Sequence, residues 1–284
     1  MTGFGDRLAA ARAENGPVCV GIDPHPELLA AWGLSDDGDG LRTFGLAVVE
    51  RLAGKVAAVK PQSAFFERHG SAGVAALEDV LAAAREAGVL TILDVKRGDI
   101  GSTMGGYAEA YLDDASPLRA DAVTLSPYLG FESLRPALDL ARRTGRGAFI
   151  LALTSNPEAA AVQRARHDGV SVAARMAAGA ADENAAARAA GEWARLGPVG
   201  LVVGATIGPT AGAAGVDLAA VDGPLLAPGI GAQGAGAAEL TEVFSTARER
   251  VVASSSRGVL AAGPEGLDAA AEALRSEVSA VLTS

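Results

Sequence analysis

Lys96 lies between two aspartates in the sequence, with Asp94 two residues before it and Asp99 three residues after it. The apolar, β-branched run that precedes them, residues 89–93, predicts a buried strand. Asp94 and Lys96 would share one face of that strand, because side chains alternate along a strand. Burying a carboxylate beside an ammonium is costly unless the two groups are paired or used. The pattern therefore predicts either a structural ion pair or a charged lysine held for chemistry.

Lysine is rare in this chain, since only positions 55, 60 and 96 among its 24 basic residues are lysines. Arginine does not lose its proton in a protein, whereas the pKa of a lysine ammonium moves with its surroundings. A chain that otherwise uses arginine for positive charge marks its lysines as candidates for catalysis. Lys60 and Lys96 both end apolar runs that predict strands, whereas Lys55 precedes its strand and is expected to be a solvated surface charge.

Short apolar runs alternate with segments of helical periodicity along the whole sequence. The expected strands are 17–23, 55–60, 89–95, 121–126, 147–153, 198–204, 224–229 and 250–255, and the clearest expected helices are 72–87, 130–143 and 234–248. Eight β/α units without a linker-like break predict one α/β domain over residues 1–284, a (β/α)8 TIM barrel. A doubly wound open sheet is the alternative, because local patterns do not show whether a sheet closes. We also expect an N-terminal helix at about 3–15 and an extra helical segment within about 157–197.

Polar side chains follow many of the expected strands at the point where each strand ends. These residues are Asp23, Lys60, Asp94, Lys96, Asp99, Ser126, Thr154, Ser155, Asn156 and Arg257. In a TIM barrel the carboxyl ends of the strands meet on one rim, and the chemistry takes place there. The gathering of these residues on one rim indicates a site more strongly than any single residue does.

The segment 229–234 reads Gly-Ile-Gly-Ala-Gln-Gly and has the spacing of a dinucleotide-binding loop. A dinucleotide site would need an acidic residue at the end of the next strand, but that strand ends in serines followed by Arg257. In the last two units of a barrel, the same residues favour a phosphate site. Glycine N–H groups can approach the anion closely, and an arginine can bind it with two hydrogen bonds.

Composition and charge exclude several classes of function. The net charge of -10 argues against a surface for nucleic acid or anionic membranes, and no apolar run approaches membrane-spanning length. The single cysteine, Cys19, rules out an internal disulfide and is expected to be a small core residue of a soluble, cytoplasmic protein. The three histidines are scattered along the chain, so no metal site is predicted.

The chain resembles the orotidine 5′-monophosphate decarboxylase family, in particular its longer bacterial branch. The motif Asp94-x-Lys96-x-x-Asp99-Ile100, with Thr103 three residues further on, carries the resemblance. Other matching segments follow in order over nearly the whole chain, at 21–24, 59–62, 126–130, 154–157, 228–231 and 256–258. The resemblance implies a TIM barrel and a carboxy-lyase that converts orotidine 5′-monophosphate into UMP and CO2 in de novo pyrimidine biosynthesis. It implies no metal and no organic cofactor.

The resemblance also implies a role for each matching residue. Lys96 would be the general acid that protonates carbon 6 of the pyrimidine, and Asp94 would lie against the substrate carboxylate and keep Lys96 charged. Lys60 would bind Asp94 and the ribose hydroxyls. Asp99, together with Ile100 and Thr103, would reach the site of a neighbouring subunit, which implies a homodimer. The remaining substrate-binding residues are Asp23 at the ribose, Ser126 at the pyrimidine, Gln233, Gly234, Arg257 and Gly258 at the phosphate, and Thr154.

The chemistry expected of the residues agrees with this resemblance. Loss of CO2 from the ring leaves a carbanion without an electron sink, and a fixed ammonium can stabilise that carbanion and then protonate it. A Mg²⁺-dependent sugar-phosphate decarboxylase with the same motif and a non-catalytic nucleotide-binding barrel remain alternatives. A Schiff-base aldolase is disfavoured, because carboxylates on both sides of Lys96 would keep its amine protonated. Since the loop 231–234 is short, we expect the segment 154–163 to take part in closure over the substrate.

Overall fold

Eight parallel strands close into a barrel in the computed structural model, which describes residues 2–231 and 234–283. The strands are β1 (Val18–Ile22), β2 (Ala58–Pro61), β3 (Leu90–Arg97), β4 (Ala122–Leu125), β5 (Gly147–Leu153), β8 (Val199–Val203), β9 (Leu225–Pro228) and β10 (Val251–Ser255). Their order around the barrel is β1-β10-β9-β8-β5-β4-β3-β2. Pairing of β1 with both β2 and β10 closes the sheet. The predicted (β/α)8 barrel is confirmed, and the open-sheet alternative is wrong.

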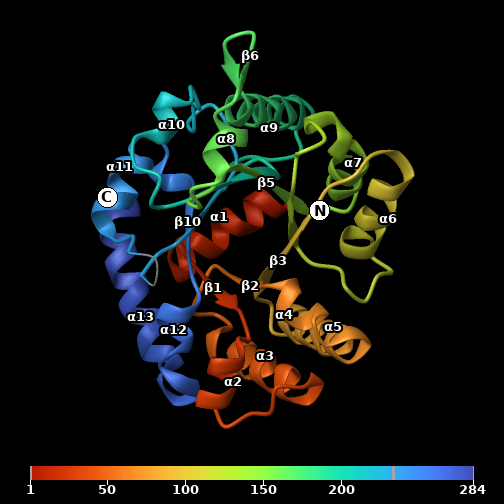
Figure 1. The fold of residues 1–284 in the computed structure, drawn as a ribbon, viewed down its shortest axis with the longest axis vertical. Helices are drawn as coiled ribbons and strands as arrows, with labels where there is room; N and C mark the ends of the chain where they lie inside the picture. The colour runs from red at the N-terminus through yellow and green to blue at the C-terminus, as the bar shows by residue number, and fades with distance from the viewer. Residues whose placement is uncertain (1, 232–233, 284) are drawn as a thin grey trace.

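Helices surround the barrel on its outside (Figure 1). They are α2 (Pro26–Ala31), α3 (Gly38–Leu52), α4 (Ser63–Glu67), α5 (Gly70–Glu86), α6 (Gly101–Leu112), α7 (Arg135–Arg143), α8 (Ala159–Gln163), α9 (Val172–Ala189), α10 (Thr210–Ala213), α11 (Ala237–Val243), α12 (Arg257–Leu260) and α13 (Gly263–Leu282), with 3-10 turns η1 (Phe131–Leu134) and η2 (Arg248–Arg250). The helix expected over 234–248 is shorter, because α11 covers only its middle. Among the described residues, none of the helices is both long and apolar enough to cross a membrane.

The alternation of side chains along the strands builds two apolar layers. In β1, for example, Val18 and Val20 pack toward the helices, whereas Cys19 packs inside the barrel. The helix α1 (Phe4–Asn15) contributes Phe4 and Leu8 to this inner layer. It therefore covers the amino-terminal end of the strands, and the barrel is open to a ligand at the other end. Cys19 is the small core residue that its apolar context predicted.

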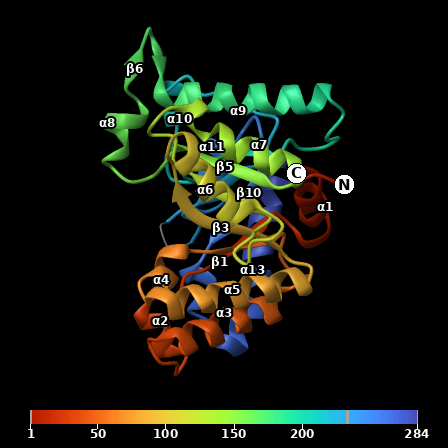
Figure 2. The same ribbon diagram turned by 90° about the vertical axis from the view of Figure 1, so that its right-hand side faces the viewer.

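The connection between β5 and α9 is longer than the others and projects from the barrel (Figures 1 and 2). It contains α8 and a hairpin of two short strands, β6 (Arg166–His167) and β7 (Val170–Ser171). A helical segment was expected in this region, but the hairpin was not. Asp168 and Gly169 both have positive φ, as a type I′ hairpin turn requires. The Asp-Gly pair was thus the available sequence signal for the hairpin.

Candidate active site

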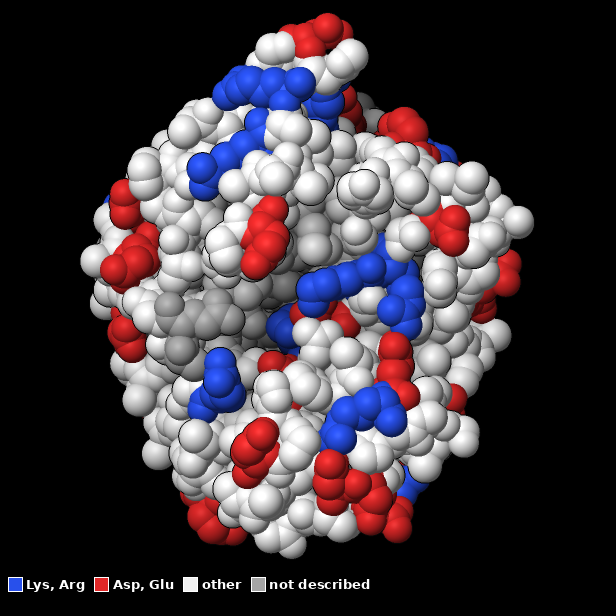
Figure 3. All heavy atoms as spheres, viewed as in Figure 1, with Lys and Arg blue, Asp and Glu red and all other residues white. Residues whose placement is uncertain are grey.

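A cavity of about 600 Å³ opens at the carboxyl ends of the strands. Its walls include polar residues at or just after the ends of β1, β2, β3, β4, β5 and β10, namely Asp23, Lys60, Asp94, Lys96, Thr124, Thr154, Ser155, Asn156, Ser254, Ser255, Ser256 and Arg257. The space-filling view shows this hollow, with charged side chains at its edge (Figure 3). The volume and the few convergent polar groups are typical of a small-molecule site.

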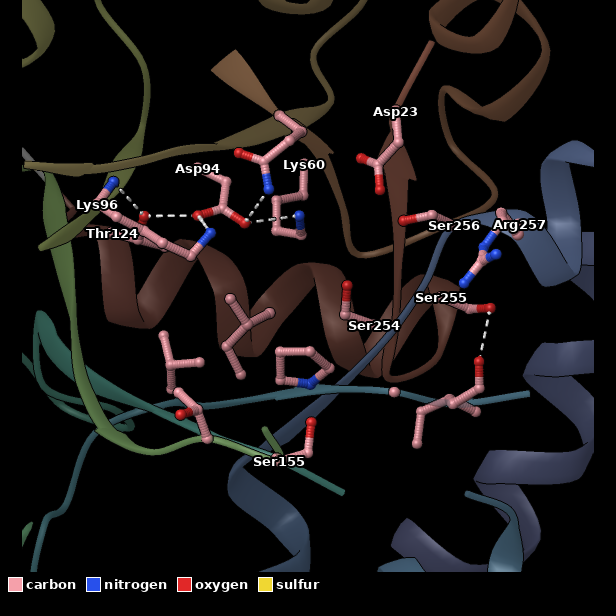
Figure 4. Close-up of a pocket in the computed structure, with 18 of the residues that line it drawn as sticks. Asp23, Lys60, Asp94, Lys96, Thr124, Ser155, Ser254, Ser255, Ser256 and Arg257 are labelled. Carbon is pink, nitrogen blue, oxygen red and sulfur yellow. Dashed lines mark hydrogen bonds and ion pairs between the residues drawn. The ribbon is translucent and has the colours of Figure 1, made fainter. Parts of the chain in front are cut away.

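The Asp94 carboxylate is the centre of a hydrogen-bonded network at one end of the cavity (Figure 4). Its Oδ1 accepts hydrogen bonds from Lys96 Nζ at 2.6 Å and from Thr124 Oγ1 at 2.8 Å. Its Oδ2 accepts from Lys60 Nζ at 2.9 Å and from Gln62 Nε2 at 3.1 Å. Asp94 and Lys60 are 7% and 5% exposed, whereas the Lys96 side chain is 46% exposed. Lys96 is therefore the member of the network that a ligand in the cavity can reach most easily.

The network holds Lys60 and Asp94 in their charged forms. Burial opposes the charge of Lys60, but the carboxylates of Asp94 and Asp23 outweigh burial and raise the pKa of Lys60 above its ordinary value. Burial likewise opposes the charge of Asp94, but Lys60 and Lys96 outweigh it and lower the pKa of Asp94 well below its ordinary value. At neutral pH the cavity thus contains an ionised carboxylate between two lysines.

An irregularity in β3 aims Lys96 at Asp94. The register between β3 and β4 shifts between Leu93 and Arg97, so the intervening residues form a bulge. Lys96 has a φ of 47°, in the left-handed region that side-chain-bearing residues rarely adopt. Bulges often re-aim side chains beside active sites, and the strained backbone here lies beneath a candidate catalytic lysine.

Asp23 lies between the Asp94 network and Arg257 (Figure 4). Its Oδ1 is buried and has no hydrogen-bond partner among residues 2–231 and 234–283, although buried polar atoms are normally paired. A ligand hydroxyl in the cavity would supply the missing donor. Gly21 permits this arrangement, since a Cβ at that position would collide with Ser256 Oγ and lie 3.0 Å from Asp23 Oδ1.

The opposite end of the cavity is suited to an anion. Gly229 and Gly231 have positive φ values of 107° and 75°, and Gly231 N donates to Ala235 O at 2.9 Å, so the turn after β9 is tight. Arg257 lines the cavity and forms no ion pair within the part of the chain that the structure describes. Its guanidinium is therefore available to bind an anion.

Several predicted site residues do not line this cavity. Gly234 and Gly258 lie near its anion end without lining it, and Gln233 lies outside the described residues. Ser126 follows β4, where its N–H donates to Arg97 O at 2.8 Å, and it is not part of the cavity wall. The wall that β4 and β5 provide consists instead of Thr124, Leu151 and the segment 154–156.

The predicted subunit-contacting residues also lie away from the cavity of their own chain. Asp99 Oδ1 accepts a hydrogen bond from Ile100 N at 2.8 Å, and Ile100 is 62% exposed. Thr103 is exposed on α6. The structure thus brings together Asp23, Lys60, Asp94, Lys96, Thr154 and Arg257, but it does not bring Asp99, Ile100 or Thr103 to the same cavity.

The sequence reasoning missed several residues of the site. Thr124 and Gln62 both bind Asp94, and further missed lining residues are His25, Phe65, Ser254 and Ser255. Thr124 is a polar residue inside an otherwise apolar strand, and that was the signal that could have identified it. Among residues 2–231 and 234–283, no group of three or more His, Cys, Asp or Glu side chains is placed to hold a metal ion.

The segment after β5 links the cavity wall to α8. Gln163 Oε1 accepts a hydrogen bond from Thr154 N at 2.8 Å, and Gln163 Nε2 donates to Thr154 Oγ1 at 2.9 Å. The short helix α8 has no buried residue. Gln163 therefore connects an exposed helix to the wall of the cavity.

Comparisons with known proteins agree with this geometry. Residues 16–273 match the model of the "Orotidine 5′-phosphate decarboxylase / HUMPS family". Curated orotidine 5′-phosphate decarboxylases from Salinispora arenicola and Streptomyces coelicolor are 58% and 55% identical, and each match covers 100% of this chain and 99% of the relative. A crystal structure of a homologue from Streptomyces avermitilis has a TM-score of 0.92 at 54% identity, covering 100% of this chain and 97% of that one. The chain therefore belongs to the orotidine 5′-phosphate decarboxylase / HUMPS family.

Proposed function

We propose that this protein decarboxylates orotidine 5′-monophosphate to UMP and CO2, a step of de novo pyrimidine biosynthesis. The observation that carries the proposal is the ionised Asp94 held between Lys60 and Lys96 at one end of the cavity. Relatives that match the full chain at up to 58% identity are named orotidine 5′-phosphate decarboxylases, which supports the same substrate here.

Lys96 and Asp94 carry out the chemical step. The substrate carboxylate lies against Asp94, and the like-charge repulsion between them is relieved when CO2 leaves. The bond between carbon 6 and the carboxylate breaks, and its electron pair remains on carbon 6. The Lys96 ammonium stabilises this carbanion electrostatically and then transfers a proton from Nζ to carbon 6. Asp94 holds that ammonium in position through a 2.6 Å hydrogen bond, and a proton from solvent restores Lys96.

The other end of the cavity binds the parts of the substrate that do not react. The unpaired Oδ1 of Asp23 accepts a hydrogen bond from a ribose hydroxyl, and Lys60 binds the ribose as well. Arg257 and the glycine turn after β9 bind the phosphate, with Gln233, Gly234 and Gly258 as further candidate contacts. Binding energy from the phosphate helps to hold the pyrimidine against Asp94 and Lys96.

The active form is a homodimer in this proposal. Asp99 and Thr103 follow the strand that carries Lys96, but they do not line the cavity of their own chain. The neighbouring Ile100 presents a large apolar side chain that is 62% exposed. These features support a role for Asp99, Ile100 and Thr103 in the cavity of a second subunit.

The experiment that tests the proposal is an ultraviolet assay of orotidine 5′-monophosphate turnover in a buffer containing a chelator. We expect turnover to persist in the chelator and to fall by at least about 10³-fold in Lys96→Ala, because both electrostatic stabilisation and proton transfer are lost. The matched control is Lys55→Ala, which removes a surface lysine paired with Asp268 at 3.0 Å and should leave turnover unchanged. An absence of turnover by folded wild-type protein would refute the proposal, and a requirement for Mg²⁺ would favour a sugar-phosphate decarboxylase.

A further inference from the structure

We infer that Thr124 is a positioning residue for the decarboxylation, whose hydroxyl holds both Asp94 and the backbone of Lys96 in place. This inference deepens the proposed function and rests on it for its kinetic consequences. The geometric part stands on the contacts of Thr124 alone.

The Thr124 hydroxyl uses both its donor and its acceptor capacity within the catalytic network. It donates to Asp94 Oδ1 at 2.8 Å and accepts from the main-chain N–H of Lys96 at 3.0 Å. Thr124 is 1% exposed, so its hydroxyl is shielded from bulk solvent. One buried oxygen atom therefore joins the carboxylate to the backbone of the lysine that the carboxylate binds.

The bulge in β3 makes this hydroxyl necessary. Leu93 pairs with Val123 and Arg97 pairs with Leu125, so only Thr124 lies opposite the three residues between Leu93 and Arg97. The ladder therefore has no regular main-chain partner for the N–H of Lys96. The side chain of Thr124 supplies the acceptor that the bulge removes, at a residue whose φ of 47° is intrinsically unfavourable.

Loss of the hydroxyl would act on geometry and leave the charges in place. Asp94 would keep Lys60, Gln62 and Lys96 as donors, so its ionised form would remain favoured. The main-chain N–H of Lys96, however, would lose its acceptor, and the Lys96 backbone would relax toward another conformation. The ammonium would then move relative to carbon 6, and a displacement of about 1 Å can lower a rate by about 10²-fold.

The test compares three variants at position 124 with a matched control. Thr124→Val keeps the shape and removes the hydroxyl, Thr124→Ala removes the hydroxyl without adding bulk, and Thr124→Ser keeps the hydroxyl. Thr91 is a close control, because its buried hydroxyl makes the same two kinds of bond with Asp121. It donates to the Asp121 carboxylate and accepts from the Asp121 main-chain N–H, each at 3.1 Å. Asp121 is not part of the cavity wall.

We expect Thr124→Val and Thr124→Ala to lower kcat by about 10²-fold while KM changes by less than about threefold. Thr124→Ser should restore most of kcat, and Thr91→Val should lose stability without losing kcat. A kcat within about twofold of wild type in folded Thr124→Ala or Thr124→Val would overturn the inference. So would equal losses of kcat in the Thr124 and Thr91 variants, because they would indicate a general structural effect.

A crystal structure of Thr124→Val separates this inference from the proposed function. If wild-type protein does not turn over orotidine 5′-monophosphate, the proposed function fails. A changed Lys96 backbone in the variant would still support the positioning role of Thr124. If the Lys96 backbone conformation and its 2.6 Å contact with Asp94 remain as they are in the native chain, the positioning role is refuted whatever the activity.

Discussion

The buried ion pair between Lys60 and Asp94 gives a quantitative prediction about the stability of the site. The two side chains are 5% and 7% exposed, and their charged atoms are 2.9 Å apart. We consider three variants: Asp94→Asn, Lys60→Met, and the two substitutions together. Each single variant leaves one buried charge without its main partner, whereas the double variant removes both charges.

The magnitude follows from the cost of an unpaired buried charge. Removing one partner of a buried pair costs about 3–5 kcal/mol, and replacing both partners costs far less than twice that amount. Asp94→Asn should lie in this range, because Lys60 then has no adjacent carboxylate except Asp23. Lys60→Met should cost less, because Lys96 and Thr124 still bind Asp94. The double variant should be destabilised by about 1–3 kcal/mol less than the sum of the two single destabilisations.

The pH of the measurement is set by the shifted pKa values. The pKa of Asp94 is lowered in the fold, so its contribution to stability is full above its ordinary pKa of about 3.9 and is lost as the pH falls below it. The pKa of Lys60 is raised, so its contribution is full below the ordinary lysine pKa of about 10.4 and is lost as the pH rises further. Both contributions are therefore complete at pH 7.

Urea unfolding at pH 7 and one fixed protein concentration measures this coupling, since the stability of an oligomer depends on concentration. The surface pair Lys55–Asp268, with side chains 49% and 43% exposed, provides the matched control cycle. Its coupling should not exceed about 1 kcal/mol. If the sum of the two single destabilisations equals the destabilisation of the double variant to within about 0.5 kcal/mol, the idea that the two charges depend on each other is refuted.

Three further predictions concern the core, the segment after β5 and the dimer. Burial raises the pKa of Cys19 to about 12, so as the pH rises the thiol ionises first in the unfolded chain. The free energy of urea unfolding should therefore be about 1–2 kcal/mol lower at pH 10.5 than at pH 9, and this decrease should be absent in Cys19→Ala. An equal loss of stability between pH 9 and pH 10.5 in the wild type and in Cys19→Ala would contradict this prediction. Gln163→Leu removes two hydrogen bonds to Thr154 and should raise KM for orotidine 5′-monophosphate by about tenfold without lowering Tm, whereas an unchanged KM would argue against a role in closure. Mixing inactive Lys96→Ala and Asp99→Ala proteins should restore activity, because a mixed dimer has one site in which both Lys96 and the partner's Asp99 are intact. If activity does not return after subunit exchange, the shared site is refuted.

The barrel and the centre of the site could be predicted because their sequence signals are local. Each strand is a short apolar run between polar segments, and the eight expected strands match the eight of the barrel to within a few residues. Lys60, Asp94 and Lys96 were recognisable because charged residues are rare at the ends of such runs. Closure of the sheet required the count of β/α units, since no single run contains that information.

Other parts of the site depend on register, which local patterns do not contain. The resemblance placed Ser126, the last residue of the expected strand 121–126, at the pyrimidine, and that contact stays a prediction. In the structure β4 ends at Leu125, and Ser126 N donates to Arg97 O. The bulge in β3 sets this pairing, and no local pattern marks a bulge at a lysine. The role of Thr124 was missed for the same reason, because it depends on which residue lies opposite the bulge.

The bonds that aim Lys96 also join three neighbouring strands of the barrel. Regular pairing between β2 and β3 stops at Val59 and Thr91, and pairing between β3 and β4 is interrupted after Leu93. At this level of the barrel, Asp94 of β3 binds Lys60 of β2 and Thr124 of β4 through side chains. Besides an isolated main-chain bridge between Gln62 and Asp94, charged and polar side chains thus join the strands at the point where the lysine must be presented to the cavity. Because the same contacts connect the strands and position the ammonium, substitutions in this network should change stability and kcat together, whereas substitutions at the phosphate end should change mainly KM.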